Sequence, residues 1–257
     1  MRIIDSHCHL VDEKVLPVVD EVIERAKQVG VEKFITMAGG RKDWPKLVEL
    51  SEKYPEVFIA FGWHPEDITK EEDLDDLEKL ILKTKKCVAM GEVGLDFFYD
   101  KEKVTKEVQI KMLAKQIELA IKLDKRLVIH VREAEEEMKE IMKTFGTSFK
   151  AQFHCFGESP TFLEQVLAGG HMVSFGGNIT FKSASNLREM VRMVPREQLL
   201  LETDTPYLSP EPKRGTQNEP ANIIYTAQII AGELKIEVAE LLETTYKNSL
   251  CFFGLEN

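Results

Sequence analysis

Short apolar runs alternate with longer amphipathic stretches from one end of the chain to the other. The runs are rich in β-branched residues, as buried strands are, and the longer stretches carry apolar residues at helical spacing. This alternation is typical of repeated βα units built on a parallel sheet. It predicts eight strands, at residues 2–5 (RIID), 33–38 (KFITMA), 57–62 (VFIAFG), 87–92 (CVAMGE), 126–131 (RLVIHV), 151–156 (AQFHCF), 172–177 (MVSFGG) and 199–204 (LLLETD).

The helical segments lie between and after these strands. Residues 15–30 place Val15, Val19, Val22 and Ala26 on one face before a stop at Gly30, and residues 105–122 form the clearest helix. Two further helices, at 222–234 and 236–252, follow the last strand. Eight βα units in 257 residues predict a (β/α)₈ TIM barrel with an extra C-terminal helix. No low-complexity stretch or linker divides the chain, so residues 1–257 are expected to form a single TIM-barrel domain.

Polar residues gather where the predicted strands end. In a TIM barrel the active site lies at the carboxyl ends of the strands, so side chains from different strands meet there. The apolar periodicity alone predicts the barrel, which makes the position of these residues a separate indication of a site at that end. They are His7, His64, Glu92, His130, His154 and Asp204.

The segment Asp5-Ser6-His7-Cys8-His9 is the first candidate for metal binding. Side chains alternate along a strand, so His7 and His9 share a face and can converge on one ion. A surface pair or a hydrogen-bonded core pair would show the same spacing. His130 and His154 end neighbouring apolar strands, and two imidazoles pointing to the same mouth favour a shared cation.

Two carboxylates complete the candidate metal centre. Glu92 lies between Gly91 and Gly94, where a ligand can approach closely, and its two oxygens can bridge two cations. Asp204 closes an apolar strand, where its charge is costly unless a cation or hydrogen bonds offset it. The alternative for either acid is a helix N-cap.

Four histidines and two carboxylates exceed the four positions around one tetrahedral zinc ion, so we expect two divalent ions per chain. Nitrogen-rich ligation favours Zn, Mn or Fe, although Mg stays possible. A water held between two ions becomes an effective nucleophile, and Asp204 can orient it or accept its proton. Asp204, His64 and Arg132 are therefore the expected catalytic residues, with His64 binding or protonating a leaving group unless it only packs.

Other residues are candidates for substrate contact. Arg132 can bind a phosphate, unless it pairs with Glu133 or Glu136. Lys213 and Arg214 are expected beside the mouth. Two further groups are expected near the same end of the barrel: Asn218, as the cap of the last barrel helix, and Phe97, Phe98 and Tyr99, as a platform for a base or as packing.

Composition excludes some classes of protein. A net charge of −10 disfavours broad wrapping of duplex DNA, so contacts to a polyanion must be local. No run is apolar enough to span a membrane, and residues 1–10 do not resemble a signal peptide, so a cytoplasmic protein without an obligate protein partner is expected. The cysteines lie far apart, which predicts reduced, buried thiols, at Cys8, Cys87, Cys155 and Cys251.

The chain resembles the TatD family of metal-dependent deoxyribonucleases, within the amidohydrolase-like barrels. The resemblance is carried, in family order, by DSHCHL, GWHPED, GEVGLDFFYD, HVREA, HCFGES and LETDTPYLSPEPKRGTQNEP. It implies that His7, His9, Glu92, His130, His154 and Asp204 hold the metal ions, with Glu92 between them. Gly157-Glu158 stands where the family commonly has Ser-Gly after HCF, which affects a loop contact and no ligand.

The resemblance also implies a nucleic-acid or phosphodiester substrate, attacked from a 3′ end. The leading hypothesis is thus a deoxyribonuclease of the 3′–5′ exonuclease type acting on DNA ends. The closest alternative is a hydrolase of small phosphoesters, amides or lactones that uses the same two ions, since such centres polarise carbonyl and phosphoryl oxygens alike. A non-catalytic scaffold is a third reading, although every expected ligand is present.

Overall fold

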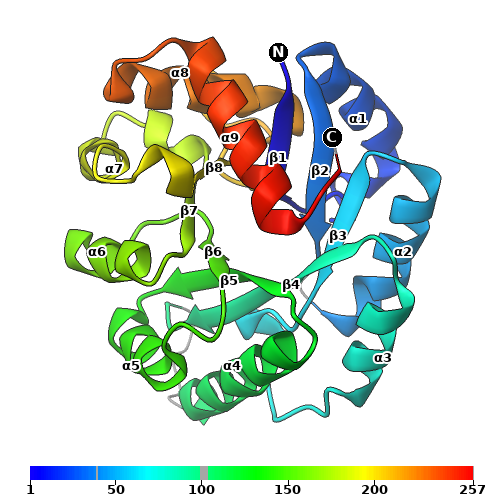
Figure 1. Ribbon diagram of the computed structural model, residues 1–257. Helices are drawn as coiled ribbons and strands as arrows, with labels where there is room; N and C mark the ends of the chain where they lie inside the picture. Colours follow the sequence, from blue (N-terminus) through cyan, green and yellow to red (C-terminus); the bar gives the residue numbers. More distant parts are fainter. Residues whose placement is uncertain (39, 99–103, 257) are drawn as a thin grey trace.

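Eight parallel strands form a nearly closed barrel in the described part of the chain (Figure 1), which confirms the predicted TIM barrel. The computed structural model describes residues 1–38, 40–98 and 104–256. Each strand pairs with the next in chain order. The strands are β1 (Ile3–Cys8), β2 (Val31–Met37), β3 (Val57–Phe61), β4 (Cys87–Asp96), β5 (Arg126–Arg132), β6 (Ala151–Phe153), β7 (Met172–Phe175) and β8 (Leu199–Leu201).

Helices surround this ring and cover its outer face (Figure 1). The longer ones are α1 (Val19–Gln28), α2 (Trp44–Lys53), α3 (Asp75–Lys83), α4 (Val104–Lys122), α5 (Glu135–Phe145), α6 (Pro160–Ala168), α7 (Ser185–Val191), α8 (Ile223–Leu234) and α9 (Val238–Phe253). Short 3₁₀ turns are η1 (Leu16–Val18), η2 (Arg41–Asp43), η3 (Pro65–Asp67), η4 (Gly177–Thr180), η5 (Arg196–Gln198) and η6 (Pro220–Asn222). Local chemistry sets their ends: Ser159 Oγ accepts the Phe162 N–H and so caps α6.

Several strand ends differ from the prediction, and most of the differences lie at the carboxyl end of the barrel; at the amino end, β2 begins at Val31, two residues earlier than predicted. β1 continues to Cys8, so His7 is inside the strand, and β4 continues to Asp96 instead of stopping at Glu92. β6 and β8 end earlier than predicted, which leaves His154 and Asp204 just beyond their strands. Apolar character determined the predicted ends, whereas pairing with β5 keeps the polar end of β4 in the sheet.

The barrel closes where the chain passes beyond β8. Thr205 pairs with Cys8 through an isolated parallel bridge, and its carbonyl accepts the His9 N–H at 2.8 Å. The Asp204 N–H donates to the His7 carbonyl at 3.0 Å. These bonds join the first strand to the segment after the last one, so His7, His9 and Asp204 are brought together by the closure itself.

Helix α9 covers the opposite, amino-terminal end of the barrel (Figure 1). Tyr246 and Phe253 from this helix are buried in one cluster with inward-facing residues at the start of the strands, namely Ile4, Ile35, Ala89, Val128 and Leu200. The Asn248 side chain donates to the Leu199 carbonyl at 2.8 Å and so fixes the helix to β8. The barrel is therefore filled with apolar side chains at this end, and the polar site lies at the other.

Two smaller predictions need correction. Asn218 does not cap α8 directly: its amide donates to the Thr203 and Tyr207 carbonyls, which ties the loop after β8 to the strand end. The four cysteines form no disulfide, and all lie in the described residues, but Cys155 is only partly buried and Cys251 is exposed on α9, whereas burial was predicted for both. Among the described residues, no helix has both the length and the apolar character needed to cross a membrane.

Candidate metal centre

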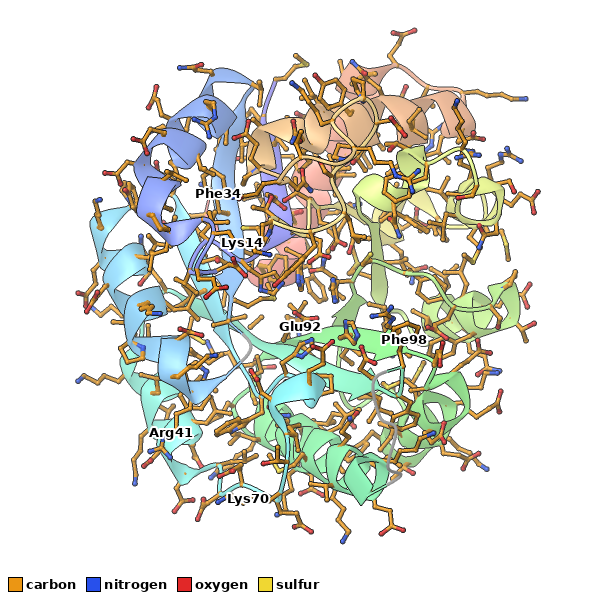
Figure 2. All side chains as sticks on the ribbon, turned by 180° about the vertical axis from the view of Figure 1, so that it is seen from behind. Lys14, Phe34, Arg41, Lys70, Glu92 and Phe98 are labelled. Atoms are coloured by element: carbon orange, nitrogen blue, oxygen red, sulfur yellow. The ribbon has the colours of Figure 1, made fainter. Side chains whose placement is uncertain are left out.

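The predicted metal ligands come together at the carboxyl end of the barrel. Figure 2 looks onto this end, and Glu92 lies near the middle of the ring of strands. His7 and Glu92 are almost fully buried, and the Asp204 side chain is 12% exposed. The site is therefore a largely buried group of imidazoles and carboxylates that opens to solvent on one side.

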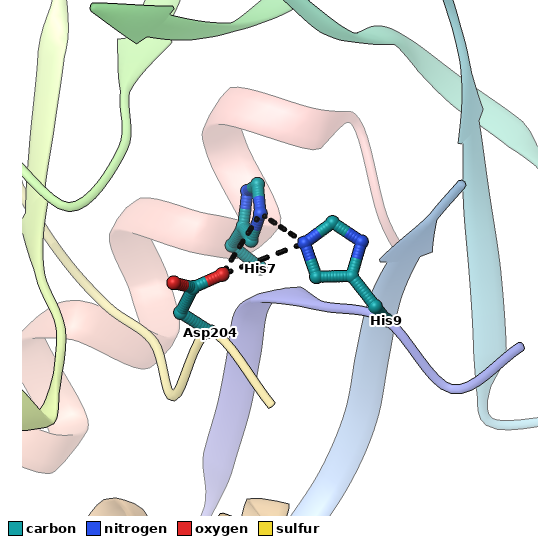
Figure 3. Close-up of side chains that lie close together, drawn as sticks. All are labelled: His7, His9 and Asp204. Carbon is teal, nitrogen blue, oxygen red and sulfur yellow. Dashed lines mark hydrogen bonds and ion pairs between the residues drawn. The ribbon is translucent and has the colours of Figure 1, made fainter. Parts of the chain in front are cut away.

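His7, His9 and Asp204 form the first donor group (Figure 3). The Nε2 atoms of the two histidines are 3.1 Å apart. Asp204 Oδ1 lies 3.5 Å from His7 Nε2 and 3.4 Å from His9 Nε2. Glu92 Oε2 adds a fourth atom, at 3.4 Å from His7 Nε2 and 3.5 Å from His9 Nε2. Asp204 holds its position with a φ of 58°, a left-handed conformation that Asp tolerates better than most residues.

These separations fit one divalent cation. A tetrahedral zinc ion with ligand bonds of about 2.0–2.1 Å has ligand atoms about 3.3–3.4 Å apart, because a tetrahedron's edge is about 1.6 times its centre-to-corner distance. The separations given above run from 3.1 to 3.5 Å. Nitrogen and carboxylate donors at these spacings are a suitable cage for zinc or a similar ion.

A second donor group surrounds the other oxygen of Glu92. Glu92 Oε1 lies 2.7 Å from His154 Nε2 and 3.1 Å from His130 Nδ1, and those two nitrogens are 3.3 Å apart. His64 Nε2 is 3.3 Å from the same oxygen. Glu92 therefore offers one oxygen to each donor group, so that the two groups share a single carboxylate.

Electrostatics keep the carboxylates ionised. Burial raises the pKa of a carboxyl group, but His154, His64 and His7 outweigh it and hold the pKa of Glu92 well below its usual range. Burial also raises the pKa of Asp204, but His9 and His7 outweigh it and the pKa is lowered. At His7 burial prevails and lowers the pKa of the imidazole. The same carboxylates outweigh burial at His9, His130 and His154 and raise the pKa of these imidazoles, so a cation binding here would displace protons from the rings.

Several groups lie behind the donors and face the second nitrogen of a ring, and two of them were not predicted from the sequence. The Met37 carbonyl lies 3.3 Å from His9 Nδ1, and Asp96 Oδ2 lies 3.0 Å from His130 Nε2. Glu202 Oε1 is 3.7 Å from His154 Nδ1. Strand alternation could have identified Asp96 and Glu202, because Asp96 shares a face with Glu92 four residues earlier and Glu202 precedes Asp204 by two.

A cavity of about 750 Å³ opens above the donors. Its lining includes His64, His130, Arg132, Tyr207 and Asn178, besides most of the donors. Acidic side chains also line it outside the donor set, namely Asp12, Asp43, Glu66, Asp67 and Glu158. Arg132 is the only Lys or Arg in this lining among the described residues. A long polyanion would thus meet mostly negative charge at the mouth.

The remaining candidates divide between the cavity and the surface. The Arg132 guanidinium carbon lies 3.7 Å from the ring centre of Phe98, which is 46% exposed, while Phe97 is buried. Tyr99, the third aromatic residue of the predicted platform, lies outside the described residues. Lys213 and Arg214 are exposed and do not belong to the cavity lining, and Arg214 stacks over Phe181 at 4.2 Å instead.

Imidazoles and carboxylates gathered at the carboxyl end of a (β/α)₈ barrel are the architecture of a metal-dependent hydrolase. The profile of the TatD-related DNase family matches residues 4–254. The chain therefore belongs to the TatD family and is a metal-dependent hydrolase, as the resemblance implied.

Relatives in bacteria match over nearly their whole length. The metal-dependent hydrolase YabD of Bacillus subtilis is 35% identical over 254 residues, which cover 98% of both chains. The metal-dependent hydrolase YcfH of Escherichia coli K12 is 32% identical over 260 residues, covering 100% of this chain and 97% of YcfH. Both names give the class of reaction and leave the substrate open.

Solved structures agree with the fold. YjjV, a TatD homologue from Escherichia coli, superposes with a TM-score of 0.93 at 27% identity and covers 99% of both chains. A TatD family hydrolase from Entamoeba histolytica has a TM-score of 0.86 at 25% identity, over 98% of both chains. An amidohydrolase from Burkholderia multivorans, solved with zinc bound, shares the fold at a TM-score of 0.62 and 15% identity, covering 100% of both chains.

Proposed function

We propose that this protein is a metal-dependent phosphodiesterase acting on DNA ends, a deoxyribonuclease of the 3′–5′ exonuclease type. The observation that carries the proposal is Glu92, whose two oxygens each join a separate donor group at the floor of one cavity. Two divalent ions would be held there, by His7, His9, Asp204 and Glu92 Oε2 on one side, and by His130, His154 and Glu92 Oε1 on the other. The 3′ polarity follows from the family resemblance.

The ions would supply charge neutralisation at phosphorus and acidification of the attacking water. Asp204, with its side chain 12% exposed at the cavity, is positioned to orient that water and accept its proton. Arg132 lines the cavity and can neutralise a neighbouring phosphate oxygen. Arg132 would thus bind a phosphate oxygen, and Asp204 would orient the water and accept its proton.

His64 is suited to protonating the leaving group. Its Nδ1 accepts the backbone N–H of Glu66 at 3.2 Å, so the proton of the neutral ring is carried on Nε2. That nitrogen lies 3.3 Å from Glu92 Oε1, at the edge of the second donor group, and the side chain lines the cavity. A proton at Nε2 can therefore be donated to an oxygen that leaves phosphorus there.

A second candidate function is supported by the acidic lining of the cavity. In the described lining, five carboxylates outside the donor set face the cavity, and Arg132 is the only Lys or Arg. This charge suits a small phosphoester, amide or lactone better than a long DNA strand. The two candidates agree on the metal centre and differ in the size of the substrate and in the bond that is hydrolysed. The DNA-end reading is preferred because an end requires contact with only one or two phosphates.

Asp204→Asn provides the direct test. The variant should fold, since its backbone N–H still donates to the His7 carbonyl, but hydrolysis should fall by about 10²–10⁴-fold. The assays are digestion of single-stranded oligonucleotides and of bis(4-nitrophenyl) phosphate by metal-reconstituted enzyme, with Lys213→Ala as the control outside the cavity. Unchanged digestion by Asp204→Asn would refute the assigned role. Turnover of lactones without any phosphodiester cleavage would refute the nuclease.

A further inference from the structure

Asp96 is a buried carboxylate that the proposed chemistry does not use. It ends β4, is 2% exposed, and is held on several sides. Its Oδ1 accepts the Phe98 N–H at 2.9 Å. Its own N–H donates to Gln109 Oε1 at 2.9 Å, and its carbonyl accepts from Gln109 Nε2 at 3.0 Å. These bonds leave one oxygen, Oδ2, facing the metal centre.

That oxygen meets the far side of a proposed metal ligand. Asp96 Oδ2 lies 3.0 Å from His130 Nε2, while His130 Nδ1 faces Glu92 Oε1 at 3.1 Å and His154 Nε2 at 3.3 Å. An imidazole binds a cation only through a nitrogen that carries no proton. An ionised carboxylate can only accept, so it requires the proton to be on the nitrogen it faces.

The neighbouring histidine needs the opposite arrangement. His154 turns Nε2 toward Glu92 Oε1, at 2.7 Å, and its Nδ1 lies on the side of Glu202. Two imidazoles of one donor group must therefore carry their protons on different nitrogens. The ring alone does not determine this choice; the group hydrogen-bonded to its other nitrogen does.

We propose that Asp96 is a positioning residue for the metal centre, which keeps the His130 proton on Nε2 and so leaves Nδ1 to bind the ion shared with Glu92 Oε1 and His154 Nε2. Asp96 does not touch the ion or the substrate. The inference rests on the proposed ligand set and is independent of the proposed substrate. It concerns one of the two ion sites only, because the donors of the other group are not hydrogen-bonded to Asp96 among the described contacts.

The isosteric variant Asp96→Asn should reverse the tautomer. The Phe98 N–H donates to the position now held by Oδ1 and needs an acceptor, so the amide oxygen of the new side chain will lie there. The amide nitrogen then faces His130 Nε2 and donates to it. His130 must carry its proton on Nδ1 instead, and that proton blocks the lone pair that the ion requires.

Two readouts test this without depending on turnover. Zinc bound per chain, measured by mass spectrometry and by competition with a chromogenic chelator, should show two tight ions in the parent and one in Asp96→Asn, the other being weakened about 10–100-fold. Long-range ¹H–¹⁵N spectra of histidine-labelled, zinc-loaded parent protein should show the His130 proton on Nε2 and none on Nδ1; a proton on Nδ1 would contradict the proposal.

Comparison variants separate positioning from general damage. Asp96→Ala removes the acceptor but donates no proton, so it should weaken the same ion less than Asp96→Asn does, although it is the larger truncation. Asp43→Asn is the matched control, since Asp43 lines the same cavity and pairs with Lys46. It should keep both ions. Circular dichroism and thermal melting of the metal-free proteins verify folding.

The outcomes are decisive. Two tight ions in the parent, one in Asp96→Asn and an intermediate affinity in Asp96→Ala support the proposal. Two ions retained in Asp96→Asn, or a greater loss in Asp96→Ala than in Asp96→Asn, would overturn it while leaving the ligand set intact. Fewer than two ions in the parent would instead refute the proposed centre.

Discussion

His171 is expected to make the stability of this protein fall steeply on mild acidification. Its side chain is fully buried at the start of β7, at the end of the barrel away from the metal centre. Nδ1 accepts the Ala151 N–H at 3.2 Å, and the ring lies 4.9 Å from Phe149 and 5.4 Å from Phe153. A protonated ring would face an N–H donor and two phenyl rings, and burial accordingly lowers its pKa to about 4.

The size of the effect follows from the two pKa values. An unfolded histidine titrates near 6.5, so between pH 6.5 and 4 the unfolded chain takes up a proton that the folded chain refuses, and stability falls as the pH falls. Below pH 4 both states are protonated and the loss stops. A difference of about 2.5 pKa units at about 1.4 kcal/mol per unit amounts to about 3.5 kcal/mol in full, of which about 3 kcal/mol is lost by pH 4.

Urea denaturation at pH 7, 6, 5 and 4 measures this loss, with His171→Asn as the comparison. The Asn oxygen can still accept the Ala151 N–H but does not titrate. Because carboxylates and the metal centre titrate equally in both proteins, the difference between the two pH profiles isolates His171. The parent should lose about 3 kcal/mol more than the variant between pH 7 and pH 4. Parallel profiles would show that the reasoning about its burial is wrong.

Three further predictions follow from the structure. Gly94→Ala would place a Cβ 1.9 Å from the His130 carbonyl oxygen, so it should lower the free energy of unfolding by about 3 kcal/mol in thermal or urea melts and weaken zinc binding. The control Gly232→Ala, in open space on α8, should be neutral or stabilising. Phe253→Ala should cost about 3–5 kcal/mol in urea melts without changing zinc stoichiometry, unless α9 does not close the barrel. Binding of oligo-dT by zinc-loaded Asp204→Asn should fall with log salt at a slope of about −0.7 to −1.4, for one to two phosphates contacted; a slope of −3 would indicate a long DNA track.

The sequence predicted the barrel because its strands are short, apolar and separated by amphipathic helices, and local pattern determines both. It also predicted which side chains meet, since strand order in a parallel barrel brings every carboxyl end to one rim. Strand ends were less well predicted. The predicted β4 stopped at Glu92, whereas pairing with β5 keeps the strand in the sheet as far as Asp96.

The groups behind the ligands could not be predicted from the sequence, for a different reason. Asp96 and Glu202 are ordinary acids in the chain, and their importance depends on which ring nitrogen each one faces. The direction of Arg214 depends likewise on the position of Phe181, which comes from a distant segment. Spacing along a chain predicts which residues share a face, but not the rotamer that decides between two neighbours.

Helix α9 covers the end of the barrel opposite the metal centre, so the residues that stabilise the fold there are separate from those that line the cavity. Tyr246 and Phe253 secure one end, while the cavity at the other is lined by strand ends and by the loops that follow them. Mutations in those loops can accumulate without loosening the apolar end, so descendants of one ancestral barrel can acquire new substrates while inheriting the same ion-binding floor.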